Sequence, residues 1–132
     1  MITEKIHIDG QLCAVIISVS KPVEASEFYT DPELILQVGQ IALNSKESIL
    51  RHRHNLVERR TFGTNEVLIV LEGSLEMELF GTHDVAQEKR TLFKGQVVIL
   101  CGGGHAFNSE NDCVILEIKN GPFMFENDKE YF

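Results

Sequence analysis

Residues 49–73 read ILRHRHNLVERRTFGTNEVLIVLEG, and this stretch decides how the chain is expected to fold. Near its start, His52 and His54 are separated by a single residue. Because side chains alternate between the two faces of an extended segment, both histidines should point one way, and Arg51 and Arg53 the other. Two imidazoles on one face, two residues apart, are a natural pair of metal ligands.

The second half of the stretch predicts a buried strand. Glu66 opens the apolar run EVLIVLE, which stops at Gly73. Residues 55–65, between the histidines and Glu66, have no clear hydrophobic period, so they predict a loop. Farther along the chain, three glycines precede another histidine, His105. A close turn there would bring His105 back toward the predicted strands.

Short apolar or alternating runs separated by turn residues recur along the rest of the chain. Asp9-Gly10, between two such runs, is a strong hairpin signal. No long stretch has helical periodicity, and about ten short strands predict an all-β sandwich or barrel in one domain, residues 1–132. The expected strands are Lys5–Ile8, Gln11–Val19, Leu34–Leu43, Ser48–His54, Glu66–Leu71, Ser74–Phe80, Glu88–Phe93, Gln96–Leu100, His105–Asn108 and Asp112–Lys119.

Composition limits the classes of partner. The chain has 132 residues, 43% of them hydrophobic, and a formal net charge of −8. The acidic balance argues against nucleic acid as a partner, because phosphate binding needs a basic face. The apolar run at residues 12–19 is too short to span a membrane, and the first residues lack the pattern of a secretory signal. A cytoplasmic location is therefore expected, with no membrane partner. Three cysteines without Cys-x-x-Cys spacing indicate neither a disulfide framework nor a thiolate zinc site.

Two motifs make the chain resemble a cupin. The first cupin motif is a His-x-His pair, a glutamate and a glycine that ends the following strand, and residues 49–73 supply His52, His54, Glu66 and Gly73 in that order. The second is a glycine, an apolar strand, a turn and a histidine, which is similar to residues 95–108, with His105 in the last position. The resemblance implies a cupin-type double-stranded β-helix, also called a jelly-roll barrel.

The resemblance also implies a metal site. Its ligands would be His52, His54, Glu66 and His105, a set that suits one divalent transition metal ion such as Zn, Fe, Mn, Ni or Cu. The loop between His54 and Glu66 is longer than in the usual motif, and Glu58 has the usual short spacing. We favour Glu66 as the carboxylate ligand, because an inserted loop leaves its register with Gly73 intact. Glu58 remains the alternative ligand and a candidate general base.

Charged side chains suggest where a ligand would bind. Arg59 and Arg60 lie in the inserted loop, and guanidinium groups bind phosphate or carboxylate through paired hydrogen bonds. Glu117 and Lys119 share one face of the last predicted strand. They are substrate-binding candidates if that face lines the cavity, and ordinary surface residues otherwise.

The pattern as a whole resembles small bacterial cupins associated with cell-surface polysaccharide or nucleotide-sugar pathways. That implies a metal-binding protein that binds or transforms a small anionic molecule, as an isomerase or oxygenase of the cupin type. Two alternatives stay open: a cofactor-free sugar epimerase or isomerase that uses a His–Asp or His–Glu pair, and a non-catalytic ligand-binding cupin. Analogy with cupins, apolar edge strands and the aromatic tail at residues 123–132 favour a homodimer.

Overall fold

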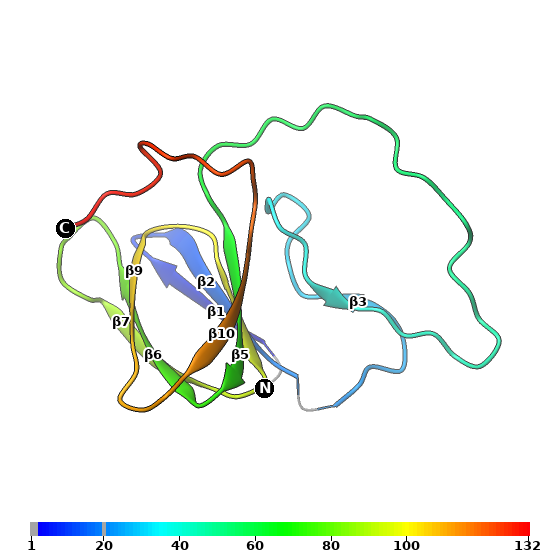
Figure 1. Cartoon of the computed structure of the whole chain (residues 1–132), viewed down its shortest axis with the longest axis horizontal. Helices are drawn as coiled ribbons and strands as arrows, with labels where there is room; N and C mark the ends of the chain where they lie inside the picture. Colours follow the sequence, from blue (N-terminus) through cyan, green and yellow to red (C-terminus); the bar gives the residue numbers. More distant parts are fainter. Residues whose placement is uncertain (1–2, 20) are drawn as a thin grey trace.

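The computed structural model describes residues 3–19 and 21–132, which form three antiparallel β-sheets and no helix (Figure 1). The predicted all-β class is confirmed. In this part of the chain there is consequently no helix of the length and apolarity needed to cross a bilayer. The strands are β1 (Thr3–Ile8), β2 (Gln11–Ser18), β3 (Glu27–Phe28), β4 (Gly39–Gln40), β5 (Glu66–Glu72), β6 (Ser74–Phe80), β7 (Glu88–Phe93), β8 (Gln96–Leu100), β9 (Gly104–Asn108) and β10 (Val114–Lys119).

Two of the sheets pack face to face and enclose the main core. One has the strand order β1-β2-β8-β5-β10, and the other has the order β7-β6-β9. The alternation in β6 explains the packing, because Leu75, Met77 and Leu79 are buried while Glu76 on the opposite face is exposed. Apolar side chains from β1, β2, β5, β7 and β8 complete the same cluster. We call this pair of sheets the sandwich.

The outer face of the five-stranded sheet carries a second, smaller apolar cluster. Val15, Ile17, Val67 and Ile99 are buried there beneath side chains that include Tyr29, Leu36 and Val38. Here the predicted strand Leu34–Leu43 was wrong in extent, since only Gly39–Gln40 pairs, with β3. The rest of that segment covers the sheet with side chains instead of extending it. This cover stops short of β10, whose outward side chains Leu116 and Ile118 stay about half exposed.

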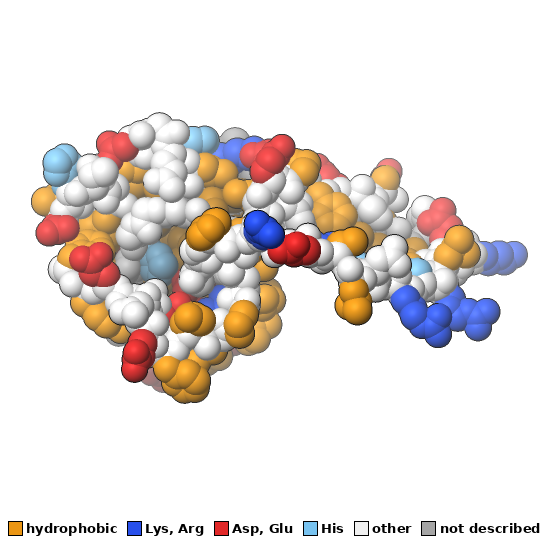
Figure 2. Space-filling model, turned by 90° about the horizontal axis from the view of Figure 1, so that it is seen from above, with side chains coloured by type: hydrophobic (Ala, Val, Ile, Leu, Met, Phe, Trp, Pro, Cys, Tyr) orange, Lys and Arg blue, Asp and Glu red, His pale blue; other side chains and the backbone are white. Residues whose placement is uncertain are grey.

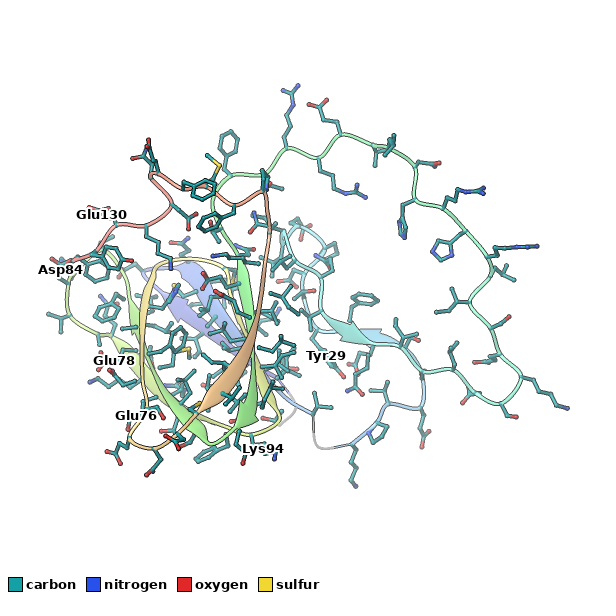
Figure 3. The ribbon with its side chains drawn as sticks, in the orientation of Figure 1. Tyr29, Glu76, Glu78, Asp84, Lys94 and Glu130 are labelled. Atoms are coloured by element: carbon teal, nitrogen blue, oxygen red, sulfur yellow. The ribbon has the colours of Figure 1, made fainter. Side chains whose placement is uncertain are left out.

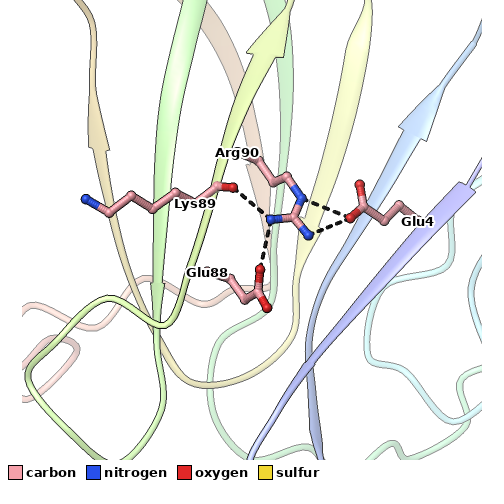
Figure 4. Close-up of polar contacts among 4 residues, drawn as sticks. All are labelled: Glu4, Glu88, Lys89 and Arg90. Atoms are coloured by element: carbon pink, nitrogen blue, oxygen red, sulfur yellow. Dashed lines mark hydrogen bonds and ion pairs between the residues drawn. The ribbon is translucent and has the colours of Figure 1, made fainter.

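The two open sides of the sandwich differ. On one side, Arg90 of β7 donates hydrogen bonds from Nε (2.9 Å) and Nη2 (2.7 Å) to Glu4 of β1, and from Nη1 (2.8 Å) to Glu88 (Figure 4). These charged groups hold the two sheets together. On the other side lie β9 and β10, each paired with a single neighbour and joined by residues 109–113. We call this side, bounded by the free edges of β9 and β10, the seam.

The predicted strand Ser48–His54 was wrong. Residues 43–62, here called the arm, contain no strand and form a long extended loop that projects from the sandwich (Figure 1). A strand needs a neighbour for its backbone N–H and C=O groups, and this segment has none in a single chain. The predicted loop between His54 and Glu66 is confirmed.

Gly73 provides a test of how tightly the turn between β5 and β6 is packed. Its φ is +75°, and a Cβ there would overlap the carbonyl oxygen of Asp112. Gly95 has a φ of +86° with open space around it, so it is a matched control. We expect Gly95→Ala to lower the free energy of unfolding by about 1–2 kcal/mol, the usual cost of a left-handed alanine. Gly73→Ala should cost about 2 kcal/mol more, because the backbone at Asp112, in the connection between β9 and β10, must shift. Urea denaturation measures both, and equal losses would contradict the packing described.

Candidate functional site

A glutamate and a histidine from different strands meet at one end of the sandwich. Glu66 begins β5, opposite Leu100 of β8 and Lys119 of β10, and only 8% of its surface is exposed. His105 follows the first residue of β9 and lies opposite Leu79. Its Nε2 is 3.2 Å from Oε2 of Glu66. The turn at Gly102–Gly104, which precedes His105, thus places the histidine beside the carboxylate.

The charge of Glu66 is stabilised by its neighbours. Hydrogen bonding to His105 is the main reason that the pKa of the Glu66 carboxyl is lowered, and burial opposes this shift. Glu117 and the Lys119 ammonium lower the pKa further. Glu66 is therefore a carboxylate at neutral pH, able to accept a proton, a hydrogen bond or a cation.

Glu117 and Lys119 lie on the face of β10 that the sequence left undecided. In the antiparallel register, Lys119 is opposite Glu66 and Glu117 is opposite Leu68, a residue of the main core. Directly opposed residues share a face of the sheet, so both charged side chains point to the inner side. The ammonium of Lys119 also lies 5.4 Å from the ring centre of Phe123. Both residues are therefore placed beside the Glu66–His105 pair.

A pocket of about 560 Å³ opens above this pair. Glu66, His105 and the glycine turn line its floor, and the tail lines the opposite wall with Met124 and residues 126–132. The tail crosses above the sheets, and Glu130 lies within this crossing (Figure 3). Phe132 fixes the tail end, because its ring lies 5.2 Å from that of Phe80. A Cβ at Gly104 would lie 2.8 Å from the Phe132 ring, so the glycine makes room for it. The volume suits a small-molecule ligand.

The pocket is acidic. Its lining includes four carboxylates but only one ammonium group, Lys129. This balance favours a cation or a neutral, hydroxyl-rich molecule over an anion. The anionic ligand expected from the sequence therefore finds few cationic partners here. The carboxylates are Glu66, Glu126, Asp128 and Glu130.

The remaining predicted site residues lie on the exposed arm. His52 and His54 keep the expected proximity, with ring centres 5.2 Å apart, and His52 Nδ1 lies 2.7 Å from the Leu50 carbonyl oxygen. Glu58 accepts a 2.8 Å hydrogen bond from Arg60, and both side chains are largely exposed. Arg59 and Arg60 line a separate surface hollow with residues 32–35 and Gln37. None of these five residues lines the pocket above Glu66 and His105.

The four predicted metal ligands thus fall into two separate pairs, His52 with His54 and Glu66 with His105. In residues 3–19 and 21–132, no three His, Cys, Asp or Glu side chains are grouped closely enough to hold a metal ion. Each pair alone nevertheless has suitable chemistry. Two atoms bound to one transition metal at about 2.1 Å lie roughly 3.0–3.4 Å apart, depending on the coordination angle. The 3.2 Å between His105 Nε2 and Glu66 Oε2 falls in that range.

Cys101, which precedes the glycine turn, is not a reactive thiol. Burial raises its pKa to about 11, so it is protonated at neutral pH. Its Sγ is 3.6 Å from the carbonyl oxygen of Leu12, to which it donates a weak hydrogen bond. A protonated, packed thiol is neither a nucleophile nor a strong metal ligand.

Asn120 is a structural residue of the site that sequence reasoning missed. Its Oδ1 accepts a 2.8 Å hydrogen bond from the backbone N–H of Asn65, and its Nδ2 donates a 3.2 Å bond to the carbonyl of Gly63. These bonds fix the end of the arm next to Glu66. Asparagine before a Gly-Pro pair indicates a turn, but the sequence does not show which distant backbone the amide binds.

Comparisons of the chain with protein-family models, curated proteins and solved structures found no match. Conclusions about function therefore rest on the contacts of Glu66 and His105 and on the pocket that they line.

The Glu66–His105 contact makes a prediction about titration. In protein treated with EDTA, His105→Gln should raise the pKa of Glu66 toward its ordinary value near 4.5, because the main cause of the lowering is removed. A folded-state pKa below the unfolded one contributes stability that is present above the ordinary pKa and is lost as the pH falls through the lowered value. The variant should therefore lose stability at neutral pH and show a smaller decline on acidification.

NMR titration of the carboxyl groups gives the pKa of Glu66, and urea denaturation between about pH 2 and pH 7 gives the stability across the range in which the carboxyl titrates. Glu117→Gln should shift the pKa of Glu66 less, since Glu117 is a weaker cause. His83→Gln is the control, because His83 lies in the exposed turn between β6 and β7. An unchanged Glu66 pKa in His105→Gln would show that the contact does not exist in solution.

Proposed function

We propose that this chain is a metal-binding protein of the cupin type, whose pocket binds or transforms a small sugar-like molecule. The Glu66–His105 pair at the pocket floor carries the proposal. It joins a carboxylate and an imidazole at a separation that suits two ligands of one ion. The acidic lining also favours a cation at this place.

The convergence of the two sequence motifs supports the cupin assignment. Glu66 belongs to the first motif and His105 to the second, and they meet although 38 residues lie between them. Gly73 directly follows the last residue of β5, the position that the first motif expects for its glycine. Facing antiparallel sheets with a pocket at one end are also compatible with a jelly-roll barrel.

The other two ligands of the proposed site are His52 and His54 on the arm. Alternation gives them a common face, and their rings lie near each other. If the arm reaches the pocket, Arg59 and Arg60 approach with it and supply the positive charge that an anionic ligand needs. Glu58 then becomes available as a general base, and Glu66 remains the preferred carboxylate ligand because of its position beside His105.

Within the pocket, the chain's own residues bind and orient the ligand. A divalent ion bound here would supply Lewis acidity to a carbonyl or hydroxyl group. Lys119 and Glu117 do not line the pocket but act on it through Glu66, since Lys119 places a cation beside this carboxylate and Glu117 adds a carboxyl group that can exchange a proton with it. The tail limits access of water from one side. These roles suit an isomerase or an oxygenase.

A second candidate is a cofactor-free sugar epimerase or isomerase. It is favoured by the same contact, since a histidine supported by a carboxylate can remove a proton next to a carbonyl group. This candidate needs neither His52 nor His54. Metal content therefore separates it from the first.

The metal proposal predicts about one transition-metal ion per chain in protein purified from metal-supplemented cells, as for a four-ligand site. The paired variants His52→Ala/His54→Ala and Glu66→Gln/His105→Ala should each lose most of the metal. A matched control is His7→Ala/His83→Ala, which removes two histidines that contact neither pair. Inductively coupled plasma mass spectrometry gives the stoichiometry.

Wild-type protein that neither contains nor gains metal would overturn the metal assignment and favour the cofactor-free candidate. A thermal-shift screen of sugars, sugar phosphates and nucleotide-sugars, followed by turnover assays, would then identify the ligand class. Binding without turnover of every hit would indicate a ligand-binding role instead of an enzyme.

A further inference from the structure

The arm has the composition of a segment that packs against another surface. Six large apolar side chains on it are exposed, and Leu56 and Phe62 are almost fully so. In the part of the chain that the structure describes, every hydrogen bond within residues 43–62 stays inside the arm. A solvated loop rarely carries this much apolar surface. The six residues are Leu43, Ile49, Leu50, Leu56, Val57 and Phe62.

The seam is a surface that lacks a strand. The free edges of β9 and β10 leave backbone groups available for pairing. Beside them, Ile115 on the inner face of β10 is partly exposed, as are Leu116 and Ile118 on its outer face. An added strand with one apolar, histidine-bearing face would cover the gap. Leu50, His52 and His54 alternate as that face requires.

The arm and the rest of the chain have opposite charge. The arm contains five Lys or Arg residues and two Glu, a formal charge of +3, and the remaining residues carry −11. Basic side chains gather at the far end of the protrusion (Figure 2). The pocket beside the seam has four carboxylates in its lining. Attraction between the arm and the seam is therefore electrostatic as well as apolar.

We propose that the arm of one chain inserts into the seam of a second copy, and that the second copy returns its own arm to the first. Each metal site then combines His52 and His54 of one chain with Glu66 and His105 of the other. The arm exchange is an inference from uncovered surfaces and charge. Only its consequence for the metal rests on the proposed function.

Two observations favour a second copy over the chain's own seam. Asn120 holds the chain at Gly63 and Asn65, just before β5, and Ser26 holds it at Ala42 through a 3.0 Å hydrogen bond, just after β4, so both ends of the arm are held while its middle projects (Figure 1). In addition, if the arm folded back into the seam of its own chain, Leu116 and Ile118 on the outer face of β10 would stay exposed. Much of the outward face of the arm would also stay exposed. A reciprocal pair covers these surfaces through one two-fold contact. The segment from His54 to Gly63 spans roughly 30 Å when extended, which is enough to reach a neighbour.

The first test measures oligomeric state. Light scattering should give a dimer for the wild-type protein and a monomer for Leu50→Asp/Leu56→Asp. Both side chains are exposed in the single chain, so the variant should fold. The matched control is Val85→Asp, which changes another largely exposed apolar residue outside the arm and should stay dimeric. A monomeric wild type, or a Leu50→Asp/Leu56→Asp variant that is still dimeric, would overturn the proposal.

The second test asks whether ligands come from two chains. His52→Ala/His54→Ala and Glu66→Gln/His105→Ala are each metal-poor, but a mixed dimer holds one intact site. After unfolding and refolding an equal mixture, about half of the dimers should be mixed, giving about one ion per four chains. An arm that folds onto its own chain would give no recovery, which would overturn arm exchange even if wild-type protein binds metal.

The two proposals can fail separately. If wild-type protein contains no metal but its dimer is lost in Leu50→Asp/Leu56→Asp and kept in Val85→Asp, arm exchange stands and the metal function fails. If wild-type protein binds metal and the mixture recovers none, the metal function stands and arm exchange fails.

Discussion

The pairing of β5 with strands on both of its sides is the constraint on which the rest of the structure depends. β5 lies between β8 and β10 in a fixed antiparallel register, with Glu66 opposite Leu100 on one side and Lys119 on the other. Because the register sets which residues share a face, it places Leu68 and Val70 in the core and Glu66 at the pocket. A slip of one residue would turn the carboxylate away from His105. The fold and the candidate site are therefore fixed by one set of backbone hydrogen bonds.

Local signals in the sequence predicted most of the sandwich. The hairpin at Asp9-Gly10 forms with φ angles of +52° and +78°, as that dipeptide favours. β6, β7 and β8 have the predicted bounds, because turn residues on both sides mark alternating or apolar runs. Ser48–His54 failed for a reason that is not local. A strand forms only where a neighbouring strand pairs with its backbone groups. The pattern within those residues does not show which strand that neighbour is.

The candidate site was predictable to the extent that motifs fix position. The meeting of Glu66 and His105 follows from two motifs on neighbouring sheets, whereas the inner orientation of Glu117 depends on a register that only the structure supplies. The wall that the tail forms was harder to predict from the sequence. It depends on contacts between residues far apart in the chain, since Phe132 packs against Phe80 and in the space left by Gly104. Sequence reasoning expected an anionic ligand, while the charged side chains that line the pocket of one chain are mostly carboxylates.

The ion pair between Arg90 and Glu4 has a consequence for how the sandwich opens. It ties β7 to β1 on one side, while β9 and β10 on the opposite side have one strand neighbour each. Local opening of a protein follows its least connected elements. The seam should therefore open before the side that Arg90 holds, so that β9 and β10 separate before the packing of Met77 and Val98 is disturbed. Entry to the interior from the seam would then require no unfolding of the core.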